Sequence, residues 1–201
     1  MLDRLRTRLR SFLDSVGSLF ARTGLSPTAY TLIGVGVSFM AGAAYSTSGY
    51  SGELAGGVLV LVAGWFDIVD GAVAKVTGKA SKTGAFLDST LDRVAEVALF
   101  GGILLGGYSP PLLVLLALSL SLLVSYARAK GDALGVALSG VGIGERSERL
   151  LILAVFSVIG LLWWGVVLVL VVALYTFIER IIRGVRALTA GSVHEDPMHS
   201  V

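Results

Sequence analysis

The chain has 201 residues, of which 55% are hydrophobic and 15% charged, and its mean hydropathy is +0.84. This composition excludes an ordinary soluble domain and is typical of a membrane protein with several spans, built as one domain with short appendages. The formal charge of +2 is small, and we expect no nucleic-acid partner. The absence of cysteine excludes disulfides and thiolate metal sites.

The first 24 residues combine apolar side chains with arginines. The apolar residues recur at steps of three and four, which predicts an amphipathic helix with a basic face; they are Leu2, Leu5, Leu9, Phe12, Val16 and Leu19. Such a helix is suited to an anionic membrane surface, although a solvated helix packed on the rest of the protein is an alternative. No continuous apolar segment follows the arginines, so we expect no secretory signal here.

Apolar segments of membrane-spanning length follow. Ser26 and Pro27 are typical residues for a helix start, and they predict a first span that ends near Tyr45. Polar turns separate three further predicted spans at 54–76, 84–106 and 112–128. As one helix, residues 150–177 would extend about 42 Å, which exceeds the roughly 30 Å of a bilayer core. Glycine and tryptophan at 160–165 suit an interfacial turn, so we predict two short spans there.

The sixteen lysines and arginines support this count of six spans. With six spans, all of them fall on the side of the N-terminus, and the turns at 46–53, 107–111 and 160–165 carry none. The positive-inside rule then places both termini in the cytoplasm. We therefore predict an all-α protein of the cell membrane with an amphipathic juxtamembrane helix at 1–24, a six-helix transmembrane domain at 25–188 and a polar, disordered tail at 189–201.

Four aspartates lie at the predicted cytoplasmic ends of the second and third spans. Asp67 and Asp70 are three residues apart, and Asp88 and Asp92 are four apart, so each pair shares one helix face. Antiparallel neighbouring spans would bring the two pairs to the same depth. Converging carboxylates repel one another unless cations bind them, and ligands that offer only oxygen suit Mg²⁺, Mn²⁺ or Ca²⁺. Simple pairing with the nearby lysines is the alternative.

The same stretch resembles the signature of the CDP-alcohol phosphotransferase family, D-x2-D-G-x2-A-R-x8-G-x3-D-x3-D. The matching positions are Asp67, Asp70, Gly71, Ala74, Gly84, Asp88 and Asp92. Lys75 stands where the family has arginine, which keeps the charge but loses the bidentate fork. The resemblance implies an enzyme that transfers the phosphatidyl or archaetidyl group from CDP-diacylglycerol or CDP-archaeol to a small polar alcohol and releases CMP.

The resemblance also implies a role for each residue of the site. The four aspartates would hold two ions, Mg²⁺ or Mn²⁺, and Asp92 would also accept the hydroxyl proton of the acceptor. Five residues would contact the CDP group: Thr28, Thr31, Gly71, Lys75 and Ser81. Members of the family form homodimers in the membrane with the active site facing the cytoplasm, and we expect the same arrangement here.

Two later segments bear on the acceptor. SYARAKGDA at 125–133 and GERSERLLIL at 144–153 resemble the phosphatidylinositol phosphate synthase branch of the family and its archaeal relatives that make archaetidylinositol phosphate. The resemblance implies that the phosphate of inositol phosphate is bound by Arg128, Lys130 and Arg180. These cations could instead be ordinary anchors at the membrane surface. The charged residues at 145–149 are expected to pair with each other or to order the preceding loop.

Other functions stay open at this point. Glycerol 3-phosphate, serine or another alcohol could replace inositol phosphate as the acceptor. A cation channel or transporter would need polar residues across the whole membrane. The second and third spans are apolar beyond their cytoplasmic third, apart from Glu96, so the sequence favours the enzyme.

Overall fold

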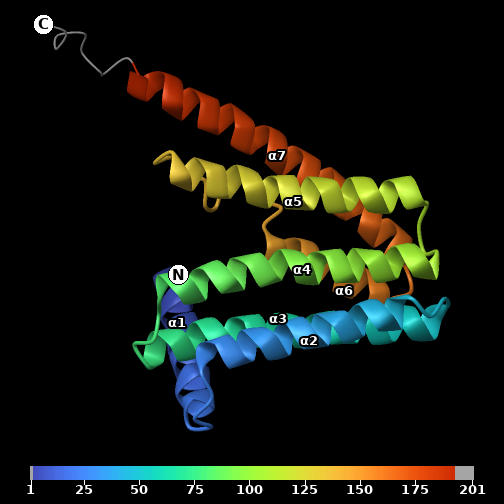
Figure 1. Cartoon of the computed structure of the whole chain (residues 1–201), viewed down its shortest axis with the longest axis horizontal. Coiled ribbons are helices and arrows are strands. Elements are labelled where there is room, and N and C mark those ends of the chain that lie inside the picture. The colour runs from blue at the N-terminus through green and yellow to red at the C-terminus, as the bar shows by residue number, and fades with distance from the viewer. Residues whose placement is uncertain (1, 193–201) are drawn as a thin grey trace, which may run out of the picture.

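The computed structural model describes residues 2–192, with side chains described within 11–190, and this part of the chain forms seven α-helices and no strand. In chain order they are α1 (Leu2–Ala21), α2 (Pro27–Tyr45), α3 (Tyr50–Val76), α4 (Lys82–Gly106), α5 (Pro111–Ala133), α6 (Arg146–Val158) and α7 (Leu162–Ser192). Helices α2 to α5 run side by side along the longest axis, and α1 crosses one end of the bundle against α3 (Figure 1). Helix α6 packs between α3 and α7, and α7 packs along α5.

Local signals set the ends of these helices. The Ser26 hydroxyl accepts a hydrogen bond from the Ala29 amide at 3.2 Å, and Pro27 is the first residue of α2. Gly107 ends α4 in a left-handed conformation, with φ of 70°. The spans predicted at 27–45, 54–76, 84–106 and 112–128 correspond to α2, α3, α4 and α5. Helix α3 begins earlier than predicted, at Tyr50, and α5 continues further, to Ala133.

The segment predicted as two short spans folds as one short helix and one long helix. Helix α6 ends at Val158 and α7 begins at Leu162, so the turn lies at 159–161 and overlaps only the start of the predicted turn at 160–165. Trp163, Trp164 and Gly165 already belong to α7. The Glu53 carboxylate of α3 accepts a hydrogen bond from the Leu162 amide at 2.5 Å and satisfies a free donor at the start of α7. Helix α7 then reaches Ser192, inside the segment predicted as a polar tail, whereas residues 193–201 lie outside the described part.

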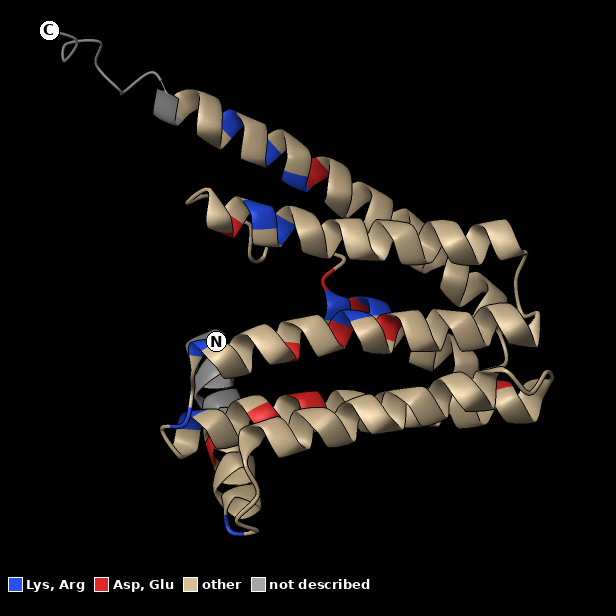
Figure 2. Cartoon of the chain, viewed as in Figure 1, with Lys and Arg blue, Asp and Glu red and all other residues tan. Residues whose placement is uncertain are grey.

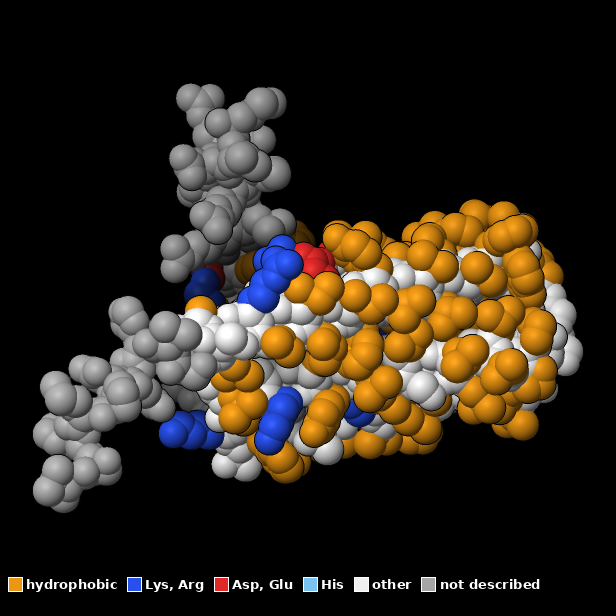
Figure 3. All heavy atoms as spheres, turned by 90° about the horizontal axis from the view of Figure 1, so that it is seen from above, with side chains coloured by type: hydrophobic (Ala, Val, Ile, Leu, Met, Phe, Trp, Pro, Cys, Tyr) orange, Lys and Arg blue, Asp and Glu red, His pale blue; other side chains and the backbone are white. Residues whose placement is uncertain are grey.

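The surface of the bundle is that of a membrane protein. Within the described residues, four helices are long and apolar enough to cross a bilayer: α2, α3, α5 and α7 as far as Ala190. Charged residues gather in the half of the bundle nearer α1 and at its middle, and the other half is almost free of them (Figure 2). Hydrophobic side chains cover that other half on the face seen in Figure 3. Such an apolar surface is stable in contact with lipid.

Glycines allow α2 and α4 to approach closely. A Cβ atom on Gly102 would lie 2.0 Å from the carbonyl oxygen of Gly42, and one on Gly106 would lie 2.0 Å from that of Tyr45. Gly102 and Gly106, which are four residues apart on α4, therefore serve packing within the chain. This close approach places α2 beside the α4 residues that contribute to the site described below.

We expect Gly102→Ala to destabilise the protein, because the added methyl group must push apart two backbones. Forcing extra volume into a well-packed contact typically costs about 1–3 kcal/mol. Gly101→Ala is the matched control, since a Cβ atom at Gly101 meets nothing within 4 Å. Thermal unfolding of the two variants in detergent measures the difference. Equal melting temperatures would contradict the packing argument.

A buried ion pair ties α6 to α4. The side chains of Arg149 and Glu96 are 1% and 0% exposed, and the Arg149 Nη2 and Nε atoms donate to Glu96 Oε1 at 2.6 and 3.2 Å. Arg149 Nη1 also donates to the carbonyl oxygen of Gly144 at 2.6 Å. Because Arg146 precedes Arg149 by one helical turn, this pair also fixes where Arg146 projects.

Candidate active site

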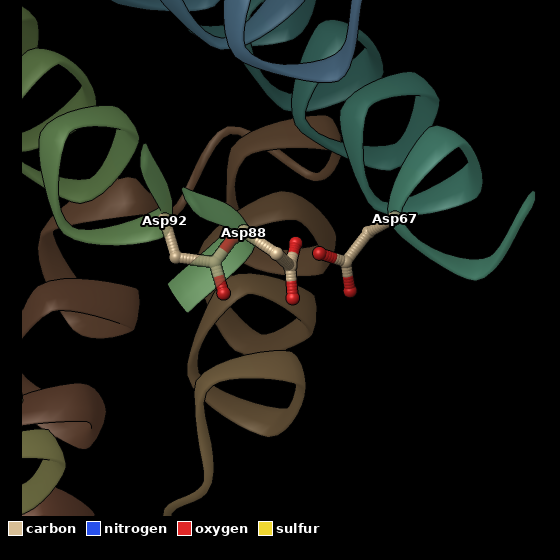
Figure 4. Close-up of side chains that lie close together, drawn as sticks. All are labelled: Asp67, Asp88 and Asp92. Carbon is tan, nitrogen blue, oxygen red and sulfur yellow. The ribbon is translucent and has the colours of Figure 1, made fainter. Parts of the chain in front are cut away.

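Three aspartates from two helices converge. Asp67 on α3 and Asp88 and Asp92 on α4 point toward one another (Figure 4), and each offers a carboxylate oxygen within 4.8 Å of the other two. Asp88 Oδ1 is buried and has no hydrogen-bond partner within the described protein. A buried acceptor without a donor, beside two further carboxylates, fits a divalent cation, because such ions prefer oxygen ligands.

Asp70 lies on α3 one turn beyond this cluster. Its Oδ2 atom accepts a hydrogen bond from Thr31 Oγ1 of α2 at 2.7 Å, and the residue is 8% exposed. The structure thus brings three of the four predicted metal ligands together and places Asp70 beside them. Asp70 and Asp88 line the same cavity, described next.

A cavity of about 210 Å³ opens between the start of α2, the end of α3 and the start of α4. Four of the five residues predicted to contact the CDP group line it: Thr28, Thr31, Gly71 and Ser81. A Cβ atom on Gly71 would meet nothing within 4 Å, so the backbone there is open to a ligand. The Ser81 hydroxyl already accepts a hydrogen bond from the Gly84 amide and caps α4.

The fifth predicted residue, Lys75, does not line this cavity. Its Nζ atom donates to Asp14 Oδ1 of α1 at 2.6 Å. Lys79 lines the cavity instead. Its place at the turn after α3 depends on how the turn folds, which the motif spacing does not encode. The pairing of Lys75 with α1 connects the amphipathic helix to the rim of the site.

A larger cleft of about 460 Å³ lies on the other side of the aspartates, between α4, α5 and the start of α6. Asp88 and Asp92 line it together with five arginines: Arg93, Arg128, Arg146, Arg149 and Arg180. Two of the three residues predicted to bind the acceptor phosphate, Arg128 and Arg180, therefore face the cleft. The third, Lys130, is exposed and does not line it.

Arg180 is held in place by three acceptors, one on α5 and two in the loop between α5 and α6. The residue is 2% exposed, and its guanidinium donates to the carbonyl oxygens of Val141 and Val124 at 3.1 and 2.8 Å and to Glu145 Oε1 at 3.3 Å. Arg128 lies 3.9 Å from the same Glu145 oxygen. A single carboxylate thus partly balances two of the cations of the cleft.

Arg146 is the residue of the site that sequence reasoning missed. Its Nη1 atom donates to Asp67 Oδ1 at 2.8 Å and lies 2.9 Å from Asp92 Oδ1. The segment 145–149 was expected to pair within itself or to order the loop. Its two glutamates do cap the start of α6, and Glu145 also accepts a hydrogen bond from the preceding loop. Its two arginines, however, pair with carboxylates on other helices. Their spacing of three, which places both on one helix face, is the signal that could have indicated this.

An apolar groove of about 310 Å³ runs between α3 and α6 and ends at Asp67 and Arg146. Its other lining residues are mostly aliphatic and include Val60, Leu61, Ile68, Leu150 and Leu151. The three hollows therefore meet at the carboxylate cluster: one polar and small, one rich in arginine, and one apolar.

The sequence of the chain is similar to those of known proteins of one family. Residues 25–178 match the family model of the CDP-alcohol phosphatidyltransferases. The chain is 33% identical over 191 residues to the archaetidylinositol phosphate synthase of Pyrococcus horikoshii, covering 95% of this chain and 100% of that protein. It is 40% identical over 154 residues to the phosphatidylinositol phosphate synthase of Streptomyces avermitilis, covering 71% and 62% of the two chains.

Solved structures of the phosphatidylinositol phosphate synthase PgsA1 of Mycobacterium tuberculosis have a similar fold. The structure with CDP-DAG bound has a TM-score of 0.74 and 26% sequence identity, covering 86% of this chain and 92% of that chain. The structure in complex with manganese and citrate has a TM-score of 0.75 and 26% identity, covering 86% and 88%.

Proposed function

Because the chain belongs to the CDP-alcohol phosphatidyltransferase family, we propose that it transfers the phosphatidyl or archaetidyl group of a CDP-linked lipid to inositol phosphate and releases CMP. One observation carries this proposal. Asp88 lines both the small polar cavity and the arginine-rich cleft. A nucleotide diphosphate in the cavity and a phosphorylated alcohol in the cleft would therefore meet at the carboxylate cluster.

The aspartates would hold two divalent ions, Mg²⁺ or Mn²⁺, in this reaction. Asp67, Asp88 and Asp92 already converge, and Asp70 lies one turn away on the face of α3 that it shares with Asp67. When bound, such ions neutralise charge that develops on the transferred and leaving oxygens. Thr31, through its hydrogen bond at 2.7 Å, would orient the Asp70 carboxylate toward the ions.

Asp92 would accept the hydroxyl proton of the acceptor. It lines the arginine-rich cleft but not the small polar cavity, so it faces the acceptor and not the nucleotide. Its side chain is 15% exposed, which limits the access of water that could compete as the acceptor. Proton removal by a carboxylate within reach of the attacking hydroxyl is ordinary general-base chemistry.

The CDP-linked lipid would occupy the small polar cavity and the apolar groove. Thr28, Gly71 and Ser81, together with Lys79, would contact the CDP group in the small cavity. The hydrocarbon chains would lie in the apolar groove between α3 and α6, because burying them there removes apolar area from water and keeps them continuous with the bilayer. Both hollows end at the aspartates, where the phosphorus under attack must lie.

We also propose the arrangement in the membrane. Helices α2 to α7 would form a six-helix domain over 25–188 in the cell membrane, with α1 on its surface, both termini and the charged half of the bundle in the cytoplasm, and a second copy completing a homodimer. Helix α6 has 13 residues, or about 20 Å, and is too short to cross alone. The loop before it, which is held by Arg180 and Glu145, would complete that crossing.

Release of CMP by the purified full chain tests the function. The assay compares CDP-archaeol with CDP-diacylglycerol, and inositol 1-phosphate with glycerol 3-phosphate, serine and free inositol. We expect the fastest release with inositol 1-phosphate, because an arginine-rich cleft selects an acceptor that carries a phosphate group. A clear preference for glycerol 3-phosphate would contradict the proposed acceptor, and no release with any alcohol would contradict the proposed reaction.

The structure predicts different effects for the two cations of the SYARAK segment. Arg128→Gln should raise the KM for inositol phosphate by about tenfold or more, because a charge-assisted contact to phosphate contributes roughly 1.5–3 kcal/mol. The KM for the CDP-lipid should stay nearly constant. Lys130→Gln is the matched control and should change neither KM much, since Lys130 does not line the cleft. Equal effects of both substitutions would indicate that the cleft is not the acceptor site.

A further inference from the structure

Arg146 occupies the position that a metal ion would need. Its Nη1 atom lies between Asp67 Oδ1 and Asp92 Oδ1, at 2.8 and 2.9 Å. Mg²⁺ lies about 2.1 Å from its oxygen ligands. A cation that bound these same two oxygens would fall within the space that the guanidinium fills, and it would also repel the positive charge of that group. The two aspartates can hold Arg146 or share a divalent ion, but not both.

Arg146 balances the negative charge of the carboxylate cluster. Three carboxylates with oxygens within 4.8 Å of one another would repel one another strongly in a partly buried site. Arg146, whose side chain is 18% exposed, supplies a cation there and makes two charge-assisted contacts. Arg93 contributes less, since its Nη1 atom lies 3.9 Å from Asp92 Oδ2 and donates to the carbonyl oxygen of Ser89.

We infer that Arg146 is a placeholder cation, which holds Asp67 and Asp92 until divalent ions replace it and which then turns into the arginine-rich cleft to bind the acceptor phosphate. The side chain starts at the first residue of α6 and lines the cleft already. Its Nε atom is buried without a hydrogen-bond partner in the described protein, so its present placement leaves one donor unused. A phosphate in the cleft could accept from Nε and Nη together.

This exchange would couple the two binding events. Loading of the metal site frees the guanidinium, so the acceptor should bind more tightly when the ions are present, and by linkage the ions should bind more tightly when the acceptor is present. The identity of the acceptor rests on the proposed function. The competition between Arg146 and the metal does not, because it concerns only this chain and the ion.

A titration with Mn²⁺ in the absence of any substrate tests the competition. Free Mn²⁺ is followed by electron paramagnetic resonance with the full chain in detergent. We expect Arg146→Gln to bind Mn²⁺ more tightly than the wild type by about tenfold or more, because no guanidinium has to be displaced. Arg93→Gln removes the same charge at a greater distance and should change the affinity by less than about threefold.

Equal or weaker binding of Mn²⁺ by Arg146→Gln would overturn the placeholder role, as would an equal gain in Arg93→Gln. Circular dichroism of each variant checks that its helix content is unchanged. If Arg146→Gln does not fold without metal, Arg146→Lys provides a second variant. It keeps a cation on a side chain without the planar fork, and its affinity for Mn²⁺ should lie above that of the wild type.

Binding of inositol phosphate, followed by calorimetry without CDP-lipid, tests the release into the cleft. In the wild type, Mn²⁺ should raise the affinity for inositol phosphate. In Arg146→Gln, the factor by which Mn²⁺ raises that affinity should be about tenfold smaller. The same gain in both proteins would overturn the second half of the inference. Tighter Mn²⁺ binding in Arg146→Gln, combined with no binding of inositol phosphate to the wild type, would instead indicate that the proposed acceptor is wrong.

Discussion

Asp88→Asn is expected to abolish transfer and metal binding together. Asparagine keeps the size of the side chain but removes the negative charge, and Asp88 is the one aspartate of the cluster that lines both the nucleotide cavity and the acceptor cleft. Stabilisation of phosphoryl charge by bound ions contributes several kcal/mol, so a loss of about a thousandfold or more in the rate of CMP release is expected. The binding of Mn²⁺ without substrate should be lost in the same variant.

Asp132→Asn is the control for this substitution. Asp132 also lines the cleft, but it lies 3.9 Å from Arg128 and belongs to no cluster of carboxylates among the described residues. Its removal should leave Mn²⁺ binding within about twofold of the wild type, because an exposed charge outside the metal site interacts weakly with the ion. If Asp88→Asn retained both Mn²⁺ binding and CMP release, the carboxylate cluster would not be the metal centre.

Arg149→Met is expected to cause the largest loss of stability. Methionine fills a similar volume but leaves the Glu96 carboxylate fully buried without its cation. Removal of one partner from a buried ion pair typically costs about 3–5 kcal/mol. The start of α6 would also lose its contact with α4, so Arg146 would no longer be held at the aspartates. The measurement is the midpoint of chemical unfolding in detergent, with Mn²⁺ absent.

Two further variants check the cause of that loss. The double variant Glu96→Leu with Arg149→Met removes both charges and should recover much of the stability. Arg183→Met breaks an exposed pair with Glu179 on α7 and should cost about 0–1 kcal/mol. A double variant no more stable than Arg149→Met would mean that packing around Arg149, and not its charge, holds α6 in place.

The aspartates of the signature were predicted on the right helix faces because that information is local. The spacings of three and four place Asp67 with Asp70 and Asp88 with Asp92 on single helix faces, whatever else surrounds them. Ser26, Pro27 and Gly107 set helix ends through hydrogen bonds and backbone angles within a few residues. The apolar segments of the sequence were long enough to predict α2, α3, α4 and α5.

The partners of the charged side chains could not be predicted in this way. Lys75 contacts Asp14, Arg146 contacts Asp67 and Asp92, and Arg149 contacts Glu96, all across large separations in sequence. Each of these cations had nearer carboxylates in the chain, such as Glu145 and Glu148 for the two arginines of α6. Which carboxylate a cation meets depends on the rotation and depth of whole helices.

The sequence by itself thus determined a helical membrane protein with paired aspartates, since helix formation and helix faces follow from neighbouring residues. Tertiary structure alone decided that Asp70 bonds to Thr31, that Lys130 stays outside the cleft and that Arg146 lies between two of the aspartates. The physical reason is that close packing at glycines such as Gly42 and Gly102 sets the distance between helices. A shift of one residue in that packing would move Asp88 and Asp92 relative to α2 and so change the geometry of the site.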